Sequence, residues 1–211
     1  MRHNLAASLV LSLLLLAGGC SDSGDGSEPG PDEPGTEKPP AELNILRLAA
    51  DAPPLESPSV SFWAVKGDDR EGRIYFLNES GERGEEYARL KIDEDALRAR
   101  PDGSLFAEGD SVLVTVTILD PAQILFQLAP EGLQFNPDEP AVLVLKYAEA
   151  DDDFDGDGER DDDDDDIEQR LGIWRQATPS DPFVRLGSAR FEDLEEIEAE
   201  LTGFSRYAIA Y

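Results

Sequence analysis

The chain has 211 residues, of which 47 are Asp or Glu and 18 are Lys or Arg, so its formal net charge at pH 7 is -29. Such an acidic surface repels phosphate groups, which excludes nucleic acid and anionic lipid headgroups as partners. The single histidine, His3, and the single cysteine, Cys20, both lie near the N-terminus. The rest of the chain therefore lacks the commonest general base and the most reactive nucleophile, and we expect that the protein is not an enzyme.

The first twenty residues have the layout of an export signal. Arg2 supplies a positive charge, and residues 5–17 (LAASLVLSLLLLA) form an apolar stretch that is short for a membrane span. The segment LLLLAGGC resembles the lipobox of bacterial lipoproteins. The resemblance implies that residues 1–19 are a signal peptide, that Cys20 is the lipid attachment site, and that Ser21 directs the protein to the outer membrane of the cell envelope. The alternative is an ordinary secretory signal followed by an incidental cysteine.

Residues 21–40 (SDSGDGSEPGPDEPGTEKPP) contain no large apolar side chain and cannot build a core. We therefore expect residues 20–40 to be the lipidated cysteine and a flexible, disordered tether. Residues 41–211 are enough for one domain with a sizeable core or for two small ones, and we expect one continuous domain.

From residue 41 onward, apolar and polar residues alternate with the period of half-buried strands. Residues 93–98 and 167–170 alone have a helical pattern, and Thr202 with Gly203 predicts a hairpin between the last two strands. Because residues 141–147 are apolar on most of both faces, that strand is expected to be central. The pattern predicts an all-β fold, an antiparallel β-sandwich. The expected strands are residues 44–48, 60–66, 73–77, 87–92, 111–119, 123–128, 141–147, 171–176, 183–186, 196–201 and 206–211.

An acidic segment, residues 149–168, interrupts this pattern with 14 acids and one base, Arg160. Alternating carboxylates with a glycine at the sharp turn provide the oxygen ligands of a calcium loop. The stretch DFDGDGERD resembles the DxDGDGxxD loops of EF-hands, dockerins and thrombospondin type 3 repeats. The candidate Ca²⁺ ligands are the carboxylates of Asp153, Asp155, Asp157, Asp161 and Asp164 and the backbone carbonyl of Glu159.

Three residues or elements depart from the pattern of those loops. Arg160 stands where an apolar residue is usual, Asp164 replaces the longer Glu, and a strand rather than a helix precedes the loop. A second register also nearly fits, with Asp151, Asp153, Asp155, Gly156, Glu159 and Asp162. The remaining alternative is a solvated acidic loop that holds no ion.

The C-terminal half, residues 105–211, resembles the sandwich domain shared by zona occludens proteins, netrin receptors and ankyrins. The resemblance is carried by a P-x-G-L-x-F segment, a central strand that follows a proline, a strand with a tryptophan, and a closing F-S-x-Y-A segment. It implies a non-catalytic sandwich with a binding or structural role, with the acidic segment as an insertion. The matching residues are Pro130, Gly132, Leu133, Phe135, residues 140–147, Trp174, Phe204, Ser205, Tyr207 and Ala208.

The expected function is that of a lipid-anchored envelope protein whose partners are the membrane, Ca²⁺ and an unidentified protein or glycan. A second hypothesis is a glycan-binding or carbohydrate-active module that stacks sugars on an exposed Trp63 or Trp174; core or sheet-edge packing is the alternative role for both rings. A third is a surface hydrolase with paired carboxylates, for which the sequence does not single out a pair.

Overall fold

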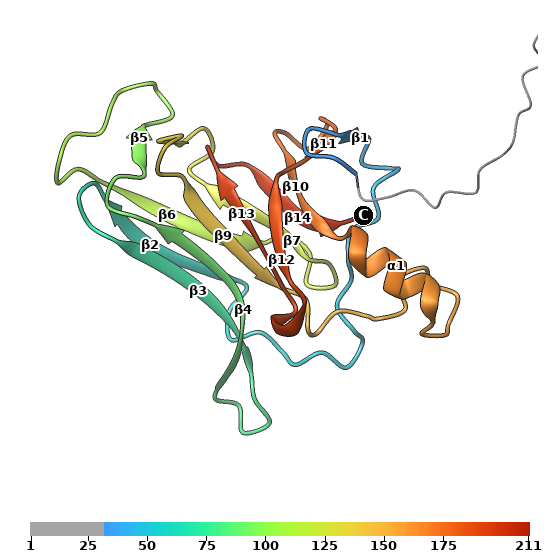
Figure 1. The fold of residues 1–211 in the computed structure, drawn as a ribbon. Coiled ribbons are helices and arrows are strands. Elements are labelled where there is room, and N and C mark those ends of the chain that lie inside the picture. The colour runs from blue at the N-terminus through green and yellow to red at the C-terminus, as the bar shows by residue number, and fades with distance from the viewer. Residues whose placement is uncertain (1–31) are drawn as a thin grey trace, which may run out of the picture.

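Alternating burial along the strands determines the architecture. In β6 (Ser111–Ile118), the side chains of Val114, Val116 and Ile118 are buried, while the residues between them reach the surface. The computed structural model describes residues 32–211, and the same alternation recurs in most of its strands. Two antiparallel sheets pack their apolar faces together, so the predicted β-sandwich is confirmed (Figure 1). The predicted signal peptide and Cys20 lie outside the described residues.

The larger sheet has seven strands and the smaller sheet has five, and a separate pair of short strands lies beside them. In order across the larger sheet these are β1 (Glu37–Lys38), β11 (Phe183–Arg185), β10 (Gly172–Gln176), β14 (Arg206–Ala210), β7 (Leu125–Ala129), β6 and β2 (Ser59–Val65). Across the smaller sheet they are β12 (Ser188–Phe191), β13 (Glu196–Leu201), β9 (Ala141–Lys146), β4 (Arg83–Ile92) and β3 (Arg70–Leu77), while β5 (Leu97–Ala99) pairs with β8 (Gln134–Phe135).

The core between the sheets is built on aromatic rings. Tyr87 lies between Phe76 and Phe126, with ring centroids 4.7 and 5.4 Å away. At one end Phe135 and Phe204 pack edge to face at 5.0 Å. Burial of these rings removes large apolar areas from water and supplies much of the driving force for folding. Phe204 and Tyr207, both in the closing F-S-x-Y-A segment, are also buried in this core.

Strand β9 lies third of five in its sheet, between β13 and β4, so its predicted central position is confirmed. The predicted hairpin at Thr202 and Gly203 is wrong, because β13 and β14 belong to different sheets. The amide of Phe204 donates to the carbonyl of Leu133 at 3.1 Å, and its ring is buried at this corner. The chain therefore crosses from one sheet to the other rather than folding back beside itself.

Two further local predictions are wrong. Residues 93–98 form a turn that leads into β5 instead of a helix, and the buried Leu97 alternates there with the exposed Arg98. Residues 44–48 make isolated bridges, at Ile45 with Ala210 and at Arg47 with Gln123, instead of a continuous strand. Strand β1 lies within the residues assigned to the tether, and it pairs with β11.

The described helices are α1 (Asp162–Arg170) and the single-turn η1 (Glu192–Leu194). The predicted helical turn at residues 167–170 is therefore the end of a helix that begins within the acidic segment. Within residues 32–211, neither helix has the length and apolar character needed to cross a membrane.

Candidate metal centre

The acidic segment connects β9 to β10, and α1 forms its second half. Figure 1 shows α1 beside the sandwich, close to the end of β14 where the chain stops. The strand before the loop was expected from the sequence, but only the last turn of the helix after it, residues 167–170, was expected. In the first predicted register, α1 begins at Asp162, directly after the ninth loop position, Asp161.

The loop is shaped by its own carboxylates. The two oxygens of Asp153 accept hydrogen bonds from the backbone amides of Gly156 and Gly158, both at 2.9 Å. Both glycines have positive φ, 79° and 95°, a conformation that L side chains rarely adopt. Asp155 then accepts from the amide of Asp157 at 3.0 Å, so successive turns close around the Asp side chains.

The helix that follows begins with a capping box. The side chain of Asp161 accepts from the amide of Asp163 at 2.9 Å, and the carboxylate of Asp164 accepts from the amide of Asp161 at 3.0 Å. The acids at positions 162–165 also lie in the first turn, where the helix dipole favours negative charge. These terms offset the weak helix propensity of Asp, which explains a helix that the apolar pattern does not reveal.

Asp164 joins the helix to the loop. Its buried carboxylate also accepts hydrogen bonds from the backbone amides of Phe154 at 2.6 Å and Asp155 at 3.3 Å. The amide of Asp161, followed by those of Asp155 and Phe154 and by the Arg160 guanidinium, holds the pKa of Asp164 below its usual range against the opposing effect of burial. Asp164 is therefore charged at neutral pH, and the backbone amides of the loop surround its carboxylate.

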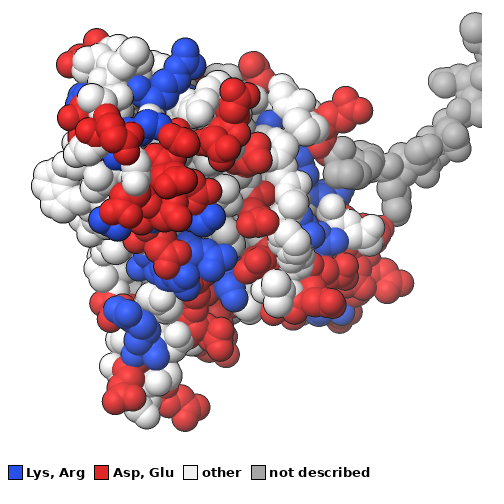
Figure 2. Space-filling view, turned by 60° about the vertical axis from the view of Figure 1, so that its left-hand side comes forward, with Lys and Arg blue, Asp and Glu red and all other residues white. Residues whose placement is uncertain are grey.

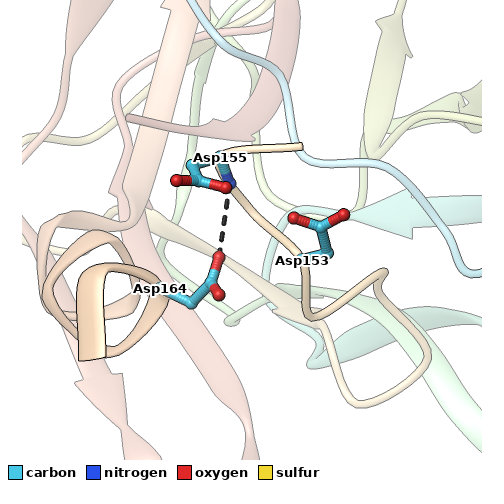
Figure 3. Close-up of side chains that lie close together, drawn as sticks. All are labelled: Asp153, Asp155 and Asp164. Atoms are coloured by element: carbon cyan, nitrogen blue, oxygen red, sulfur yellow. Dashed lines mark hydrogen bonds between the residues drawn. The ribbon is translucent and has the colours of Figure 1, made fainter. Parts of the chain in front are cut away.

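Carboxylate oxygens of Asp153, Asp155 and Asp164 converge, each within 4.8 Å of the others (Figure 3). The hydrogen bond from the amide of Asp157 lowers the pKa of Asp155, but desolvation and the charges of Asp157, Asp164 and Asp153 outweigh it, so the net pKa is raised. The fold thus holds like charges together at a point where a cation would relieve their repulsion.

The converging group contains three of the six predicted ligand residues, at positions 1, 3 and 12 of the first register. Asp164 has no place in the second register. The carboxylate of Asp157 accepts from the amide of Glu159 at 2.9 Å, and that of Asp161 caps the helix. Neither belongs to the group, and nor does the side chain of Glu159. Three hard oxygen donors suit Ca²⁺ or Mg²⁺ better than a softer transition metal.

Three contacts that the sequence does not reveal tie the segment to the sandwich. The hydroxyl of Tyr211, the last residue, donates to the carbonyl of Phe154. On the other side, Glu168 of α1 accepts from the hydroxyl of Tyr147 at 3.1 Å and pairs with Arg190 of β12 at 3.2 Å. Burial raises the pKa of Tyr147 to about 12, so its hydroxyl stays a donor at neutral pH. The position of α1 therefore depends on residues far away in sequence.

A cavity of about 360 Å³ opens beside the carboxylates of Asp153 and Asp155. Its other walls come from the segment around Arg47 and from Gln123 and Tyr211. An ion at the converging group would be reachable by water, which commonly completes the coordination of Ca²⁺ in proteins.

The two tryptophans have opposite surroundings. Trp174 is fully buried beneath the N-terminal segment and donates from its indole N–H to the carbonyl of Ala210 at 3.0 Å. Trp63 is 59% exposed on β2, an edge strand, where it pairs with the half-exposed Leu113 of β6. Trp174 is thus a core residue, and Trp63 alone of the two presents a ring to solvent.

Comparisons with protein families, with curated proteins and with solved structures found no match for this chain. The resemblances to lipoproteins, to calcium loops and to the zona occludens, netrin receptor and ankyrin sandwich stay predictions that rest on the residues quoted for them.

Proposed function

We propose that the protein is a lipid-anchored envelope protein whose non-catalytic β-sandwich binds Ca²⁺ at Asp153, Asp155 and Asp164 and is stabilised by it. The observation that carries this proposal is the convergence of the three carboxylates at the junction of loop and helix. The role of the ion is to fix the acidic segment against the sandwich, and the role of the sandwich is binding or structural.

Two physical arguments support calcium as a stabilising ion. Without a cation, the folded state holds like charges together that the unfolded chain separates, and a bound cation turns that repulsion into attraction. An ion that binds only the folded state stabilises it in proportion to the logarithm of its concentration over its dissociation constant. Extracellular calcium modules commonly work at 10⁻⁴–10⁻³ M, so a site with few protein ligands suits an envelope address.

The anchor rests on the sequence alone. LLLLAGGC ends at Cys20, and residues 21–31 precede the described part of the chain. A lipid on Cys20 together with a short tether holds the acidic domain near a membrane surface without a spanning segment. Metabolic labelling of the expressed protein with a palmitate analogue tests this step, because Cys20→Ser should abolish the label and labelled Cys20→Ser protein would overturn the anchor.

Thermal unfolding of the chain from Ser21 onward tests the calcium step, since residues 32–211 contain both sheets and the whole described core. Added Ca²⁺ should raise the melting temperature of the wild-type chain by several degrees. In Asp155→Asn, which keeps the side-chain shape, the gain should vanish. Asp152→Asn is the matched control, because Asp152 is exposed in the same segment and outside the converging group. An unchanged calcium response in Asp155→Asn would overturn the site.

The exposed ring of Trp63 favours a second candidate function, glycan binding. Flat aromatic faces stack on sugar rings, and Trp63 lies on an open edge strand. Titration of a glycan library against the indole fluorescence of Trp174→Phe, in which Trp63 is the remaining tryptophan, tests this. Saturable changes that disappear in Trp63→Ala would support it, and a flat response to every glycan would contradict it.

A further inference from the structure

On the outer face of the five-stranded sheet, most bases lie on β3 and β4 at one side, and a row of acids lies on β13 at the other side. Figure 1 shows this sheet at the front, with the described chain leaving β9, β4 and β3 uncovered. The outward residues of β3 and β4 include the bases Arg73, Arg89 and Lys91, with Glu71 and Glu86 ion-paired to Arg73, whereas β13 presents Glu196, Glu198 and Glu200. Figure 2 shows basic side chains gathered in one patch on this side of the molecule, bordered by acidic ones.

An apolar row separates the two halves. Val142 and Val144 of β9 point to the same face, and the pairing places Val144 beside both Arg89 and Glu198. Lys91 and Glu200 flank Val142 in the same way. Because strands lie about 4.8 Å apart, the backbones of each such pair are roughly 10 Å apart across β9. Among residues 32–211 neither pair of opposite charges forms an ion pair across that strand.

Of the three outward acids of β13, Glu196 alone has a basic partner within residues 32–211, Lys146 of β9 at 3.9 Å. Glu198 and Glu200 have no ion pair among residues 32–211. On the basic half, Arg89 approaches only Glu86, at 3.6 Å, and Lys91 reaches Asp93 at the end of its strand. Acids without an ion pair and bases in partly exposed ion pairs thus lie on one face, at matching heights on either side of a common strand.

From this arrangement we propose that the outer face of the five-stranded sheet pairs with the same face of a second copy of the chain. A two-fold axis parallel to β9 stacks one β9 over the other and exchanges left and right. Arg89 of each copy then lies over Glu198 of the other, and Lys91 over Glu200. A partner of a single charge sign would be repelled by one half of the face, while a second copy is complementary to both.

The face is small for a specific protein–protein interface. Five strands and about six residues along each give roughly 500 Å² per copy, or about 1,000 Å² in total. That is the lower limit for a specific interface, so we expect a weak, reversible dimer. The large net negative charge of each chain also opposes association.

Sedimentation equilibrium of the chain from Ser21 onward, between micromolar and millimolar concentrations, tests the proposal. The wild-type chain should show a reversible monomer–dimer equilibrium. Arg89→Glu/Lys91→Glu reverses the charge at two positions of the basic half, and Glu198→Lys/Glu200→Lys reverses it at the two facing positions of the acidic half. Each double variant alone should lose dimerisation at least tenfold, because like charges then face each other.

Association of a mixture of the two double variants is the decisive measurement for this face-to-face pairing. In the heterodimer each reversed residue faces a residue of opposite charge, so the four proposed pairs form again and the mixture should associate about as strongly as the wild-type chain. Matching circular dichroism spectra and melting temperatures establish that each variant is folded. A wild-type chain that stays monomeric at every concentration, or a mixture that associates no better than its components, would overturn the proposal.

Discussion

The buried carboxylate of Asp164 in α1 accepts a 2.6 Å hydrogen bond from the backbone amide of Phe154, ten residues earlier in the loop. The same carboxylate accepts from the amide of Asp161, at the start of the helix. One side chain thus satisfies backbone donors on both sides of the loop, and the loop and the helix form one unit.

Replacing Asp164 should therefore destabilise the protein even when no calcium is present. Asp164→Ala leaves the amides of Phe154, Asp155 and Asp161 without their acceptor, and the melting temperature in a chelator should fall by several degrees. Asp163→Ala is the matched control, because Asp163 is exposed in the same helical turn. Equal melting temperatures for the two variants in chelator would contradict the role given to Asp164.

Asp155 should behave in the opposite way. Its pKa is raised, so the folded state disfavours its charge, and Asp155→Asn should melt at a higher temperature than the wild type in chelator at pH 7. In saturating Ca²⁺ the order should reverse, because the variant has lost a ligand. Calorimetry should therefore show the variant melting above the wild type in chelator and below it in Ca²⁺. A variant that melts below the wild type in both conditions would show that Asp155 has a purely structural role.

Two buried tyrosines provide a test of the core. Among residues 32–211 the hydroxyl of Tyr87 has no hydrogen-bond partner, whereas the hydroxyl of Tyr207 donates to the carbonyl of Gly203. Tyr87→Phe should raise the free energy of unfolding by about 1 kcal/mol, because it removes an unsatisfied buried group, and Tyr207→Phe should lower it by about 1 kcal/mol. Urea unfolding measures both, and the same sign for the two variants would contradict the hydrogen bonding described.

Burial also raises the pKa of Tyr87, which predicts a dependence on pH. The pKa of Tyr87 in the folded state lies above its value of about 10 in the unfolded chain. Above pH 10 the unfolded chain therefore ionises first, and the free energy of unfolding falls as pH rises further. Tyr87→Phe should therefore lose less stability than the wild type between neutral pH and pH 11. Parallel stability curves for the two proteins over that range would show that Tyr87 is already accessible to water.

Quenching by acrylamide distinguishes the surroundings of the two tryptophans. A neutral quencher avoids the repulsion or attraction that an ion would meet at this acidic surface. Emission from Trp63→Phe comes from the buried Trp174 and should be weakly quenched, while emission from Trp174→Phe should be strongly quenched. Trp174→Phe should also cost about 2 kcal/mol of stability, since it leaves a cavity and frees the carbonyl of Ala210.

The strands could be predicted from the sequence because their period of two is local information. The partition of strands between sheets could not. Thr202 and Gly203 look like a hairpin turn, but the outcome depends on the buried contact of Phe204 with Phe135, nearly seventy residues away in the chain. The same holds for residues 94–96, where a turn leads into β5 because β5 pairs with β8.

In the candidate site, too, the local features could be predicted from the sequence and the long-range contacts could not. The spacing of acids and glycines predicts Asp153, Asp155 and Asp164, because loop geometry within twelve residues is local. The helix α1 is hidden because its stabilisation comes from a capping box and the helix dipole, which an apolar pattern does not record. Tyr211 and Arg190 contact the segment from 57 and 22 residues away, and no spacing within the segment indicates them.

Isothermal titration of Ca²⁺ into the chain from Ser21 onward is the most direct measurement of the central claim. The calcium site predicts one saturable binding event per chain, with a dissociation constant no weaker than about 1 mM. That event should be lost in Asp155→Asn and kept in Asp152→Asn. No saturable binding by the wild-type chain, or equal binding by Asp155→Asn, would contradict a calcium site at Asp153, Asp155 and Asp164.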